Sequence, residues 1–354
     1  MGGAGGANAM IPIQYALRRR MMMMTNRIPQ LFYYGLAPQL SAARNRISAT
    51  TVGNYALFGG GWGSGNAHFS TVDAYDTSLT RTTPTALSVA RGSSAATTVG
   101  NYALFGGGYG SGPFSTVDAY DTSLTRTTPT ALSVARSYFA ATTVGNYALF
   151  GGGKEDGAFV STVDAYDTSL TRTTPTALSA ARNHLAATTV GNYALFGGGI
   201  SSDVFSTVDA YDTSLTRTTP TALSVARSHF AATTVGNYAL FGGGYASGYL
   251  STVDAYDTSL TRTTPTALSV ARNQFAATTV GNYALFGCGH GSGSPGHLST
   301  VDAYDTSLTR TTPTALSVAR EFLAATTVGN YALFGGGRDS HYYFSSTVDA
   351  YQVK

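Results

Sequence analysis

The stretch "ATTVGNYALFG" at residues 49–59 decides the architecture of this 354-residue chain, because it recurs until seven copies are present. Its Gly-Asn pair returns at intervals between 45 residues (Gly100 to Gly145) and 48 residues (Gly281 to Gly329). A second block, "STVDAY", also occurs seven times, and a third, "DTSLTRTTPTALS", occurs six times. A fixed internal period of this length overrides the domain number that chain length alone suggests. The chain is therefore a repeat protein.

Each repeat reads as a set of short strands. Its apolar residues alternate or run in short bursts between turn-forming residues, and no sustained helical stripe is present. In the second repeat this pattern predicts four strands, here named a to d, at 95–99, 102–107, 115–120 and 124–133. The "GN" and "DTS" segments suit the a–b and c–d turns, because their residues tolerate turn geometry. Four strands per period of about 45 residues are typical of a propeller blade, so the sequence predicts an all-β, seven-bladed β-propeller of four-stranded antiparallel blades.

The missing copy of the third block indicates how the ring closes. The last repeat ends after strand c, at "STVDAYQVK", whereas "FYYGLAPQLSAAR" at 32–44 aligns without gaps with "LTRTTPTALSVAR" at 79–91. We expect the N-terminal strand to complete the last blade, which leaves no open sheet edge. The predicted domains are a flexible, Gly-rich and basic leader at 1–28 and a propeller at 29–354. The leader is a candidate binding segment for an assembly partner.

The order "YALFGG", then "VDAYD", then a strand leading to "AR" resembles the kelch-repeat family over about residues 31–354. The resemblance implies a kelch-type propeller. It departs from the family in strand d, where a Trp is usual; this chain has Thr or Arg there, and its only Trp is Trp62. The kelch family includes copper oxidases, but no clear set of Tyr, Cys and His ligands can be carried over to this sequence.

The composition of the chain limits the classes of function that it can have. The recurring blocks contain 13 Arg and 13 Asp, so the formal net charge of +3 comes from outside them, largely from the first 28 residues. A neutral scaffold argues against nucleic-acid binding. The single cysteine, Cys288, excludes an intramolecular disulfide. We recognise neither a secretory signal nor a membrane span, and the sequence assigns no compartment.

Variation is confined to two kinds of loop. In an up-and-down blade the b–c and d–a loops lie at one end, and these are the segments that differ between repeats, for example "WGSGNAHF" at 62–69 and "NRI" at 45–47. Relaxed constraint on loops is one explanation. However, the a–b and c–d turns are loops too, and they have not changed. We therefore predict a diversified ligand-binding face, rich in the Tyr, His, Ser, Gly and Asn that adaptable recognition loops use.

The candidate contact residues come from both loop sets. The last apolar residue of most segments more simply begins a strand and packs inward, as expected for Phe69, Phe114, Phe139, Phe205 and Phe230. The candidates from the b–c loops are Trp62, His68, Tyr109, Lys154, Asp156, Asp203, Tyr245, Tyr249, His290, Arg338, His341 and Tyr342. Those from the d–a loops are Arg46, Tyr138, His184, His229, Gln274 and Glu321.

Each blade also places one arginine at the start of its d–a loop. Seven guanidinium groups around a channel mouth could form an anion-binding ring. Alternatively, each arginine could pair with a scaffold aspartate such as Asp73. The seven are Arg44, Arg91, Arg136, Arg182, Arg227, Arg272 and Arg320.

These features predict a non-enzymatic recognition module that binds a protein or glycan ligand through the variable loops. The alternative is a structural component of a larger surface or virion assembly, anchored by the leader or the invariant face. A metal-dependent, oxidase-like or hydrolytic propeller ranks below both. His290, His297 and His341 show no spacing typical of metal ligands, so we expect no metal site and no cofactor. The scaffold acids repeat identically in every blade, as structural groups do, and no catalytic motif is present.

Overall fold

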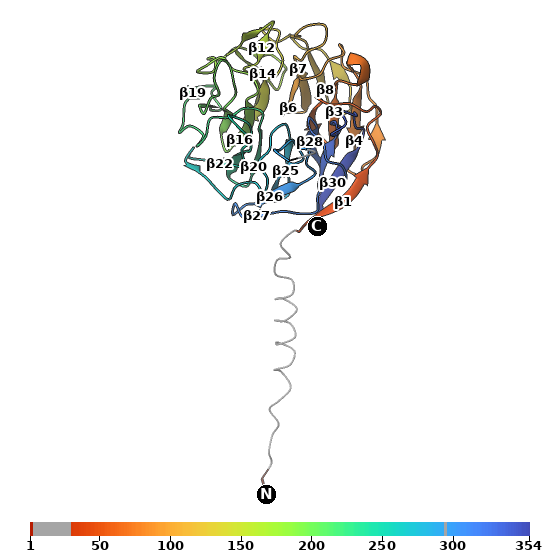
Figure 1. The fold of residues 1–354 in the computed structure, drawn as a ribbon, viewed down its shortest axis with the longest axis vertical. Helices are drawn as coiled ribbons and strands as arrows, with labels where there is room; N and C mark the ends of the chain where they lie inside the picture. Colours follow the sequence, from red (N-terminus) through yellow and green to blue (C-terminus); the bar gives the residue numbers. More distant parts are fainter. Residues whose placement is uncertain (3–29, 294–295) are drawn as a thin grey trace.

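The computed structural model describes residues 1–2, 30–293 and 296–354. In this part of the chain, seven four-stranded antiparallel sheets stand in a ring, as blades around a central axis (Figure 1). The predicted all-β, seven-bladed propeller is confirmed. The predicted leader lies, apart from its first two residues, outside the described residues. No helix in the described ranges is both long enough and apolar enough to cross a membrane.

Six blades are contiguous in the chain. The first two are β2 (Ser48–Val52), β3 (Tyr55–Gly59), β4 (Val72–Tyr75) and β5 (Arg81–Thr82), then β6 (Ala95–Val99), β7 (Tyr102–Gly106), β8 (Val117–Tyr120) and β9 (Arg126–Thr127). The next two are β10 (Ala140–Val144), β11 (Tyr147–Gly151), β14 (Val163–Asp167) and β15 (Arg172–Thr173), then β16 (Ala186–Val190), β17 (Tyr193–Gly197), β18 (Val208–Tyr211) and β19 (Arg217–Thr218). The fifth and sixth are β20 (Ala231–Val235), β21 (Tyr238–Gly242), β22 (Val253–Tyr256) and β23 (Arg262–Thr263), then β24 (Ala276–Val280), β25 (Tyr283–Gly287), β26 (Val301–Asp305) and β27 (Arg310–Thr311). A two-stranded ribbon, β12 (Lys154–Glu155) and β13 (Ala158–Phe159), and a 3-10 turn, η1 (Ser64–Asn66), form within b–c loops.

The seventh blade joins the two ends of the propeller. It contains β28 (Ala324–Val328), β29 (Tyr331–Gly335) and β30 (Val348–Val353), and its fourth strand is β1 (Leu31–Ala37) from the other end of the domain. β1 pairs antiparallel with β30, from Leu31 opposite Val353 to Ala37 opposite Val348. The Tyr33 hydroxyl also donates a hydrogen bond of 2.6 Å to Asp349.

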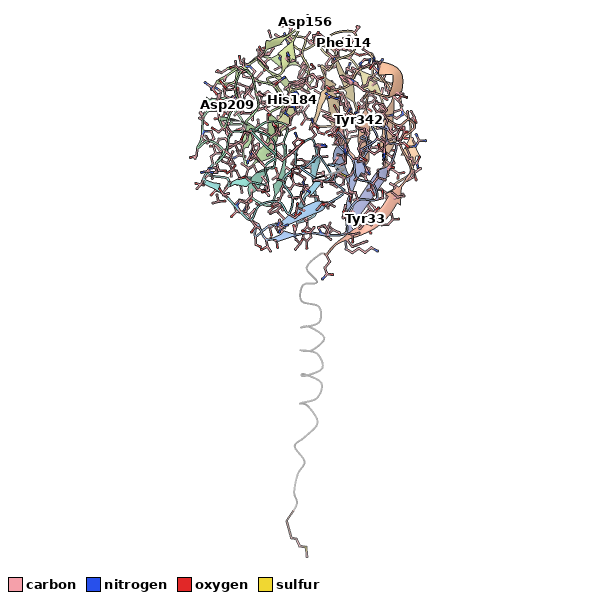
Figure 2. All side chains as sticks on the ribbon, in the orientation of Figure 1. Tyr33, Phe114, Asp156, His184, Asp209 and Tyr342 are labelled. Carbon is pink, nitrogen blue, oxygen red and sulfur yellow. The ribbon has the colours of Figure 1, made fainter. Side chains whose placement is uncertain are left out.

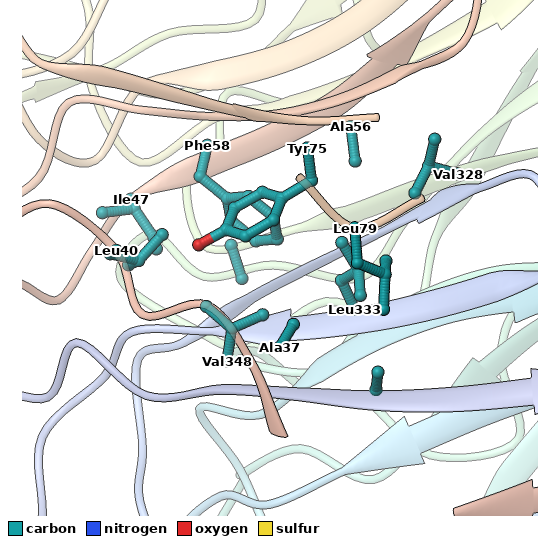
Figure 3. Close-up of a cluster of buried hydrophobic side chains, with 12 residues drawn as sticks. Ala37, Leu40, Ile47, Ala56, Phe58, Tyr75, Leu79, Val328, Leu333 and Val348 are labelled. Atoms are coloured by element: carbon teal, nitrogen blue, oxygen red, sulfur yellow. The ribbon is translucent and has the colours of Figure 1, made fainter. Parts of the chain in front are cut away.

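The hydrophobic core lies between adjacent blades. The last four residues of each strand b and the "VDAY" residues of each strand c are buried, and in the second blade the rings of Phe105 and Tyr120 meet edge to face at 5.9 Å. Figure 3 shows the cluster in which Phe58 and Tyr75 of the first blade pack beside Leu333 and Val348 of the seventh. Because one blade cannot bury its own faces, each apolar layer stabilises two neighbours together.

A close approach of neighbouring blades explains the glycine that ends each strand b. A Cβ at Gly106 would lie only 3.0 Å from a ring carbon of Phe150 in the next blade. A side chain at this position would force the Phe150 ring to shift, so the position favours glycine.

Threonines of strand a form two circles around the axis. In one, hydroxyl pairs 2.8–2.9 Å apart join every blade to the next, as between Thr50 and Thr98. In the other, a Thr hydroxyl of each blade donates to a carbonyl of the blade before it, as Thr51 does to Thr327 at 2.5 Å. The inner wall of the propeller is thus held by side-chain hydrogen bonds.

A buried aspartate in strand c fastens each blade to the segment that leaves the preceding one. Asp209 accepts hydrogen bonds from Arg182 (2.7 Å) and from the backbone and hydroxyl of Ser179, which both precede β16, and from Arg217 (2.7 Å) in its own strand d. The side chains of Asp209 and Arg182 are fully buried. An Arg–Asp pair of this kind recurs in every blade, with Nη2–Oδ2 distances of 2.5–2.8 Å.

We expect Asp209→Ala to lower the free energy of unfolding by about 3–5 kcal/mol, because it leaves the buried Arg182 charge without its partner. The matched control is Asp212→Ala in the neighbouring c–d turn, where Asp212 accepts two backbone N–H bonds of 2.9 Å at the surface. It should cost about 1 kcal/mol. Urea unfolding measures both values, and equal losses would contradict this account of Asp209.

A variant that begins at residue 41 lacks β1, and we expect its melting temperature to fall by roughly 10 °C or more, because the seventh blade loses a strand that contributes to its apolar cluster. A variant that begins at residue 29 keeps β1 and is the control. Thermal unfolding of the two proteins tests the closure. Retention of the parent melting temperature by the shorter protein would refute it.

Candidate ligand-binding face

The two variable loop sets meet in every blade. The first residue of each d–a segment forms a backbone bridge with the first residue of the b–c segment; in the first blade Asn45 and Trp62 exchange hydrogen bonds of 2.8 and 2.9 Å. The other bridged pairs are Gly92–Tyr109, Ser137–Lys154, Asn183–Ile200, Ser228–Tyr245, Asn273–His290 and Glu321–Arg338.

The invariant turns gather at the other end of the strands. Six of the seven a–b turns lie against the c–d turn of the next blade, so that a Cβ at Gly100 would be 3.1 Å from Thr168, and the a–b turn of the sixth blade lies against Val353. The propeller therefore has one variable face and one invariant face.

The middle residue of each d–a segment belongs to a closed ring of backbone hydrogen bonds around the axis. The N–H of each donates to the carbonyl of its counterpart in the preceding blade, at 2.9–3.2 Å, and Arg46 closes the circle by donating to Phe322. All have positive φ, from +49° at Arg46 to +56° at Tyr138. This inner ring consists of Arg46, Ser93, Tyr138, His184, His229, Gln274 and Phe322.

The inner ring surrounds a pocket of about 300 Å³. Its wall contains all seven inner-ring residues and the residue that follows each of them, which is Ser94 in one blade and apolar in the other six, as Phe139 and Phe230 are. In Figure 2, His184 lies near the centre of the disc, whereas Asp156 lies at its margin. Five predicted contact residues, one from each of five blades, thus converge on one cavity.

Two histidines of the inner ring are held uncharged. The rings of His184 and His229 stack 3.8 Å apart, and the Tyr138 ring lies 4.8 Å from His184. Burial, and then the neighbouring His229, lower the pKa of His184 to about 3. Burial and the Arg46 charge lower the pKa of His229 to about 4. Near neutral pH both rings therefore offer hydrogen-bonding nitrogens without charge.

Arg46 supplies the positive charge of the inner ring. Its guanidinium lies 4.7 Å from the Trp62 ring centroid and 4.3 Å from that of Phe322, and its Nη1 donates to the Tyr138 hydroxyl at 3.2 Å. Burial lowers the pKa of Arg46. The aromatic rings fix the plane of the guanidinium by cation–π contact.

The b–c loops form the outer part of the face. Tyr109, Tyr245 and Tyr342 have more than a third of their surface exposed. Next to the central pocket, a second hollow of about 400 Å³ lies between two blades, and Tyr138 lines both. The rest of this outer hollow is formed by Tyr109, Pro113, Ser137, Lys154, Asp156 and Gly157.

Other predicted b–c residues contact one another. His68 packs on Trp62 at 5.4 Å, and the Tyr249 hydroxyl is 2.7 Å from Nδ1 of His290. Asp203 and His341 are exposed, and His341 stacks on Tyr343.

Glu321 was predicted as a contact residue, and this is wrong. It is 3% exposed and accepts a 2.7 Å hydrogen bond from Nε of Arg338, with Arg338 Nη2 also 2.7 Å away. Glu321 occupies the bridge position, so the inner-ring member of its blade is Phe322. Ser93 and Phe322 were missed by sequence reasoning. Counting two places from the invariant arginine of each blade would have found both.

The anion-binding ring is also wrong, and the alternative of structural ion pairs is correct. Arg44 is fully buried and lies 2.7 Å from Asp73, and its six counterparts are paired in the same way. Guanidinium groups without exposed surface cannot meet a ligand at the channel mouth. These counterparts are Arg91, Arg136, Arg182, Arg227, Arg272 and Arg320.

The apolar residues that end the variable loop segments are buried or partly buried. Phe139 and Phe230 are buried, each with its ring 6.2 Å from a strand-b Phe ring, and Phe69, Phe114 and Phe205 are partly buried. Over residues 1–2, 30–293 and 296–354, no three His, Cys, Asp or Glu side chains are placed to hold a metal ion.

Comparison with known proteins adds no family. No protein-family model matches the chain, and no curated protein matches its sequence. The seven-bladed ring is compatible with the kelch-type propeller that the repeat motifs resemble.

The lowered histidine pKa values predict acid sensitivity. Between about pH 6.5 and pH 4 the unfolded chain takes up protons at His184 and His229 while the folded protein does not. Stability is therefore full above about pH 6.5 and falls as the pH drops, by about 1–2 kcal/mol per histidine at pH 5. The double variant His184→Asn/His229→Asn keeps a residue type that tolerates positive φ. Urea unfolding at several pH values should show a shallower pH dependence for it, and parallel curves would refute the assignment.

Proposed function

We propose that this propeller is a non-enzymatic recognition module that binds a protein or glycan through the b–c and d–a loops. One observation carries the proposal. The side chains that differ between blades converge on one face, around one pocket, at inner-ring positions where the backbone favours glycine.

The residue types of the inner ring support this function, because none of them is glycine. A φ near +50° costs a side-chain-bearing residue about 1–2 kcal/mol relative to glycine. The chain contains 42 glycines, yet none occupies the inner ring. Retention of Arg, Tyr, His and Gln at strained positions is expected where the side chain itself has a role.

The exposed tyrosines of the outer loops support it as well. Tyr109, Tyr245 and Tyr342 present amphipathic rings of low conformational entropy, which suit contact with a peptide or a sugar ring. The threonine hydroxyls of the invariant turns repeat without change around the other face, and they offer no comparable diversity.

The test compares two triple variants on glycan and peptide arrays. Tyr109→Ala/Tyr245→Ala/Tyr342→Ala removes exposed rings from the variable face, and the ligands bound by the parent protein should lose at least about tenfold in affinity. The matched control removes three exposed threonines of the invariant turns, Thr122, Thr168 and Thr213, and should bind like the parent. Melting temperatures establish that both variants are folded.

The outcomes separate cleanly. Loss of array binding in the tyrosine variant alone supports the proposal. Equal binding by the two variants, equal loss in both, or no bound glycan or peptide for the parent protein would overturn it.

A further inference from the structure

We propose that the central pocket binds the carboxylate of an acidic sugar, with Arg46 as the anion anchor. This inference rests on the proposed function, and it names the ligand chemistry for the inner part of the same face.

Arg46 differs from every other arginine of the described ranges. The scaffold arginines are paired with strand-c aspartates, and Arg338 is paired with Glu321. Arg46 has no carboxylate within ion-pair distance among the described residues. The one side-chain hydrogen bond of Arg46 within these ranges runs from Nη1 to the Tyr138 hydroxyl, so Nε and Nη2 keep their donors for a ligand. A guanidinium clamped by aromatic rings is ordered before the ligand arrives, which favours a planar, bidentate partner.

The charge of the pocket fits a monoanion. His184 and His229 are neutral near pH 7, and Gln274, Ser93, Tyr138 and Phe322 are uncharged residue types. A single positive charge balances one carboxylate, whereas a phosphate dianion would need a second cation. Lys154 stands in the outer hollow, where its Nζ lies 5.6 Å from the Phe159 ring.

The other polar groups fit a polyhydroxylated ring. The pocket offers two imidazoles, an amide and a phenol, which together donate and accept from several directions. The backbone N–H and C=O groups of the inner ring are already bonded to one another. A peptide, which needs backbone partners, therefore finds few, while sugar hydroxyls find side chains. The volume of about 300 Å³ lies at the small end of ligand sites and suits one sugar unit.

The position of the outer hollow indicates where the next sugar of a glycan would lie. Tyr138 lines both cavities, so a terminal acidic sugar beside Arg46 would place the next unit against Tyr109 and Lys154. Aromatic faces and a mixed-charge rim suit a second sugar there.

The experiment titrates the full-length protein with glucuronic acid, galacturonic acid and N-acetylneuraminic acid by calorimetry. We expect at least one to bind with a Kd on the order of 1 mM. Glucose and galactose, which lack the carboxylate, should bind at least about tenfold more weakly, as should acetate, which lacks the ring.

Three variants identify the site. Arg46→Met should weaken the acidic sugar at least about tenfold, and Gln274→Ala by a smaller factor. Lys154→Met should leave the monosaccharide unchanged, since Lys154 lies in the outer hollow. Gln274→Ala also serves as the readout if Arg46→Met fails to fold.

Failure of this inference can be told from failure of the proposed function. Absence of binding by all three acidic sugars, binding unchanged in Arg46→Met and Gln274→Ala, or equal binding of acetate or inorganic phosphate would overturn the acidic-sugar assignment. If array ligands still depend on the tyrosines of the outer loops in that case, the recognition function stands without it.

Discussion

A buried carboxylate in strand c holds each part of this propeller in place. An isolated charge in a fully buried position is too costly to persist, so Asp73 is stable there only when all its partners are in place. Arg44 and Ser41 come from the segment that leaves the preceding blade, and Arg81 comes from the same blade. The geometry between blades is therefore fixed by directed ion pairs as well as by apolar packing. Since Arg44 also begins the d–a loop, the same interaction fixes where the variable residues start.

The inner ring separates backbone order from side-chain identity. Its backbone N–H and C=O groups are bonded around the axis, and the conformation is nearly the same for Arg46, Ser93 and Phe322, with φ from +49° to +54°. The fold consequently makes no demand on these side chains beyond tolerance of positive φ. Their chemistry can change from blade to blade while the ring persists.

The features that were predicted correctly from the sequence are those that follow from its repeats. Seven copies of a four-strand pattern determine the ring, and the parity of chain reversals puts the b–c and d–a loops on one face. The two errors have a common physical cause, since burial depends on which neighbours surround a side chain. Arg44 and its counterparts are charged but fully buried, because the aspartate that receives them lies 27 to 30 residues further on, as in Arg91–Asp118 and Arg272–Asp302. Glu321 belongs to a varied segment, but the bridge turns it inward onto Arg338, and only the backbone register shows this.

Relaxed constraint accounts for part of the contrast between the two faces. In the c–d turns, Asp121 accepts backbone hydrogen bonds from Ser123 and Thr125, so these turns have a structural reason to stay unchanged. Drift at unconstrained positions would, however, favour residues that relieve strain, and glycine relieves it best at positive φ. Arg46 does the opposite, because it adds a charge without an ion-pair partner among the described residues to a strained position beside a cavity. A desolvated cation is unfavourable for the free protein and becomes favourable when an anion reaches it. The physical cost carried by Arg46 is therefore the strongest reason to regard the variable face as a binding surface.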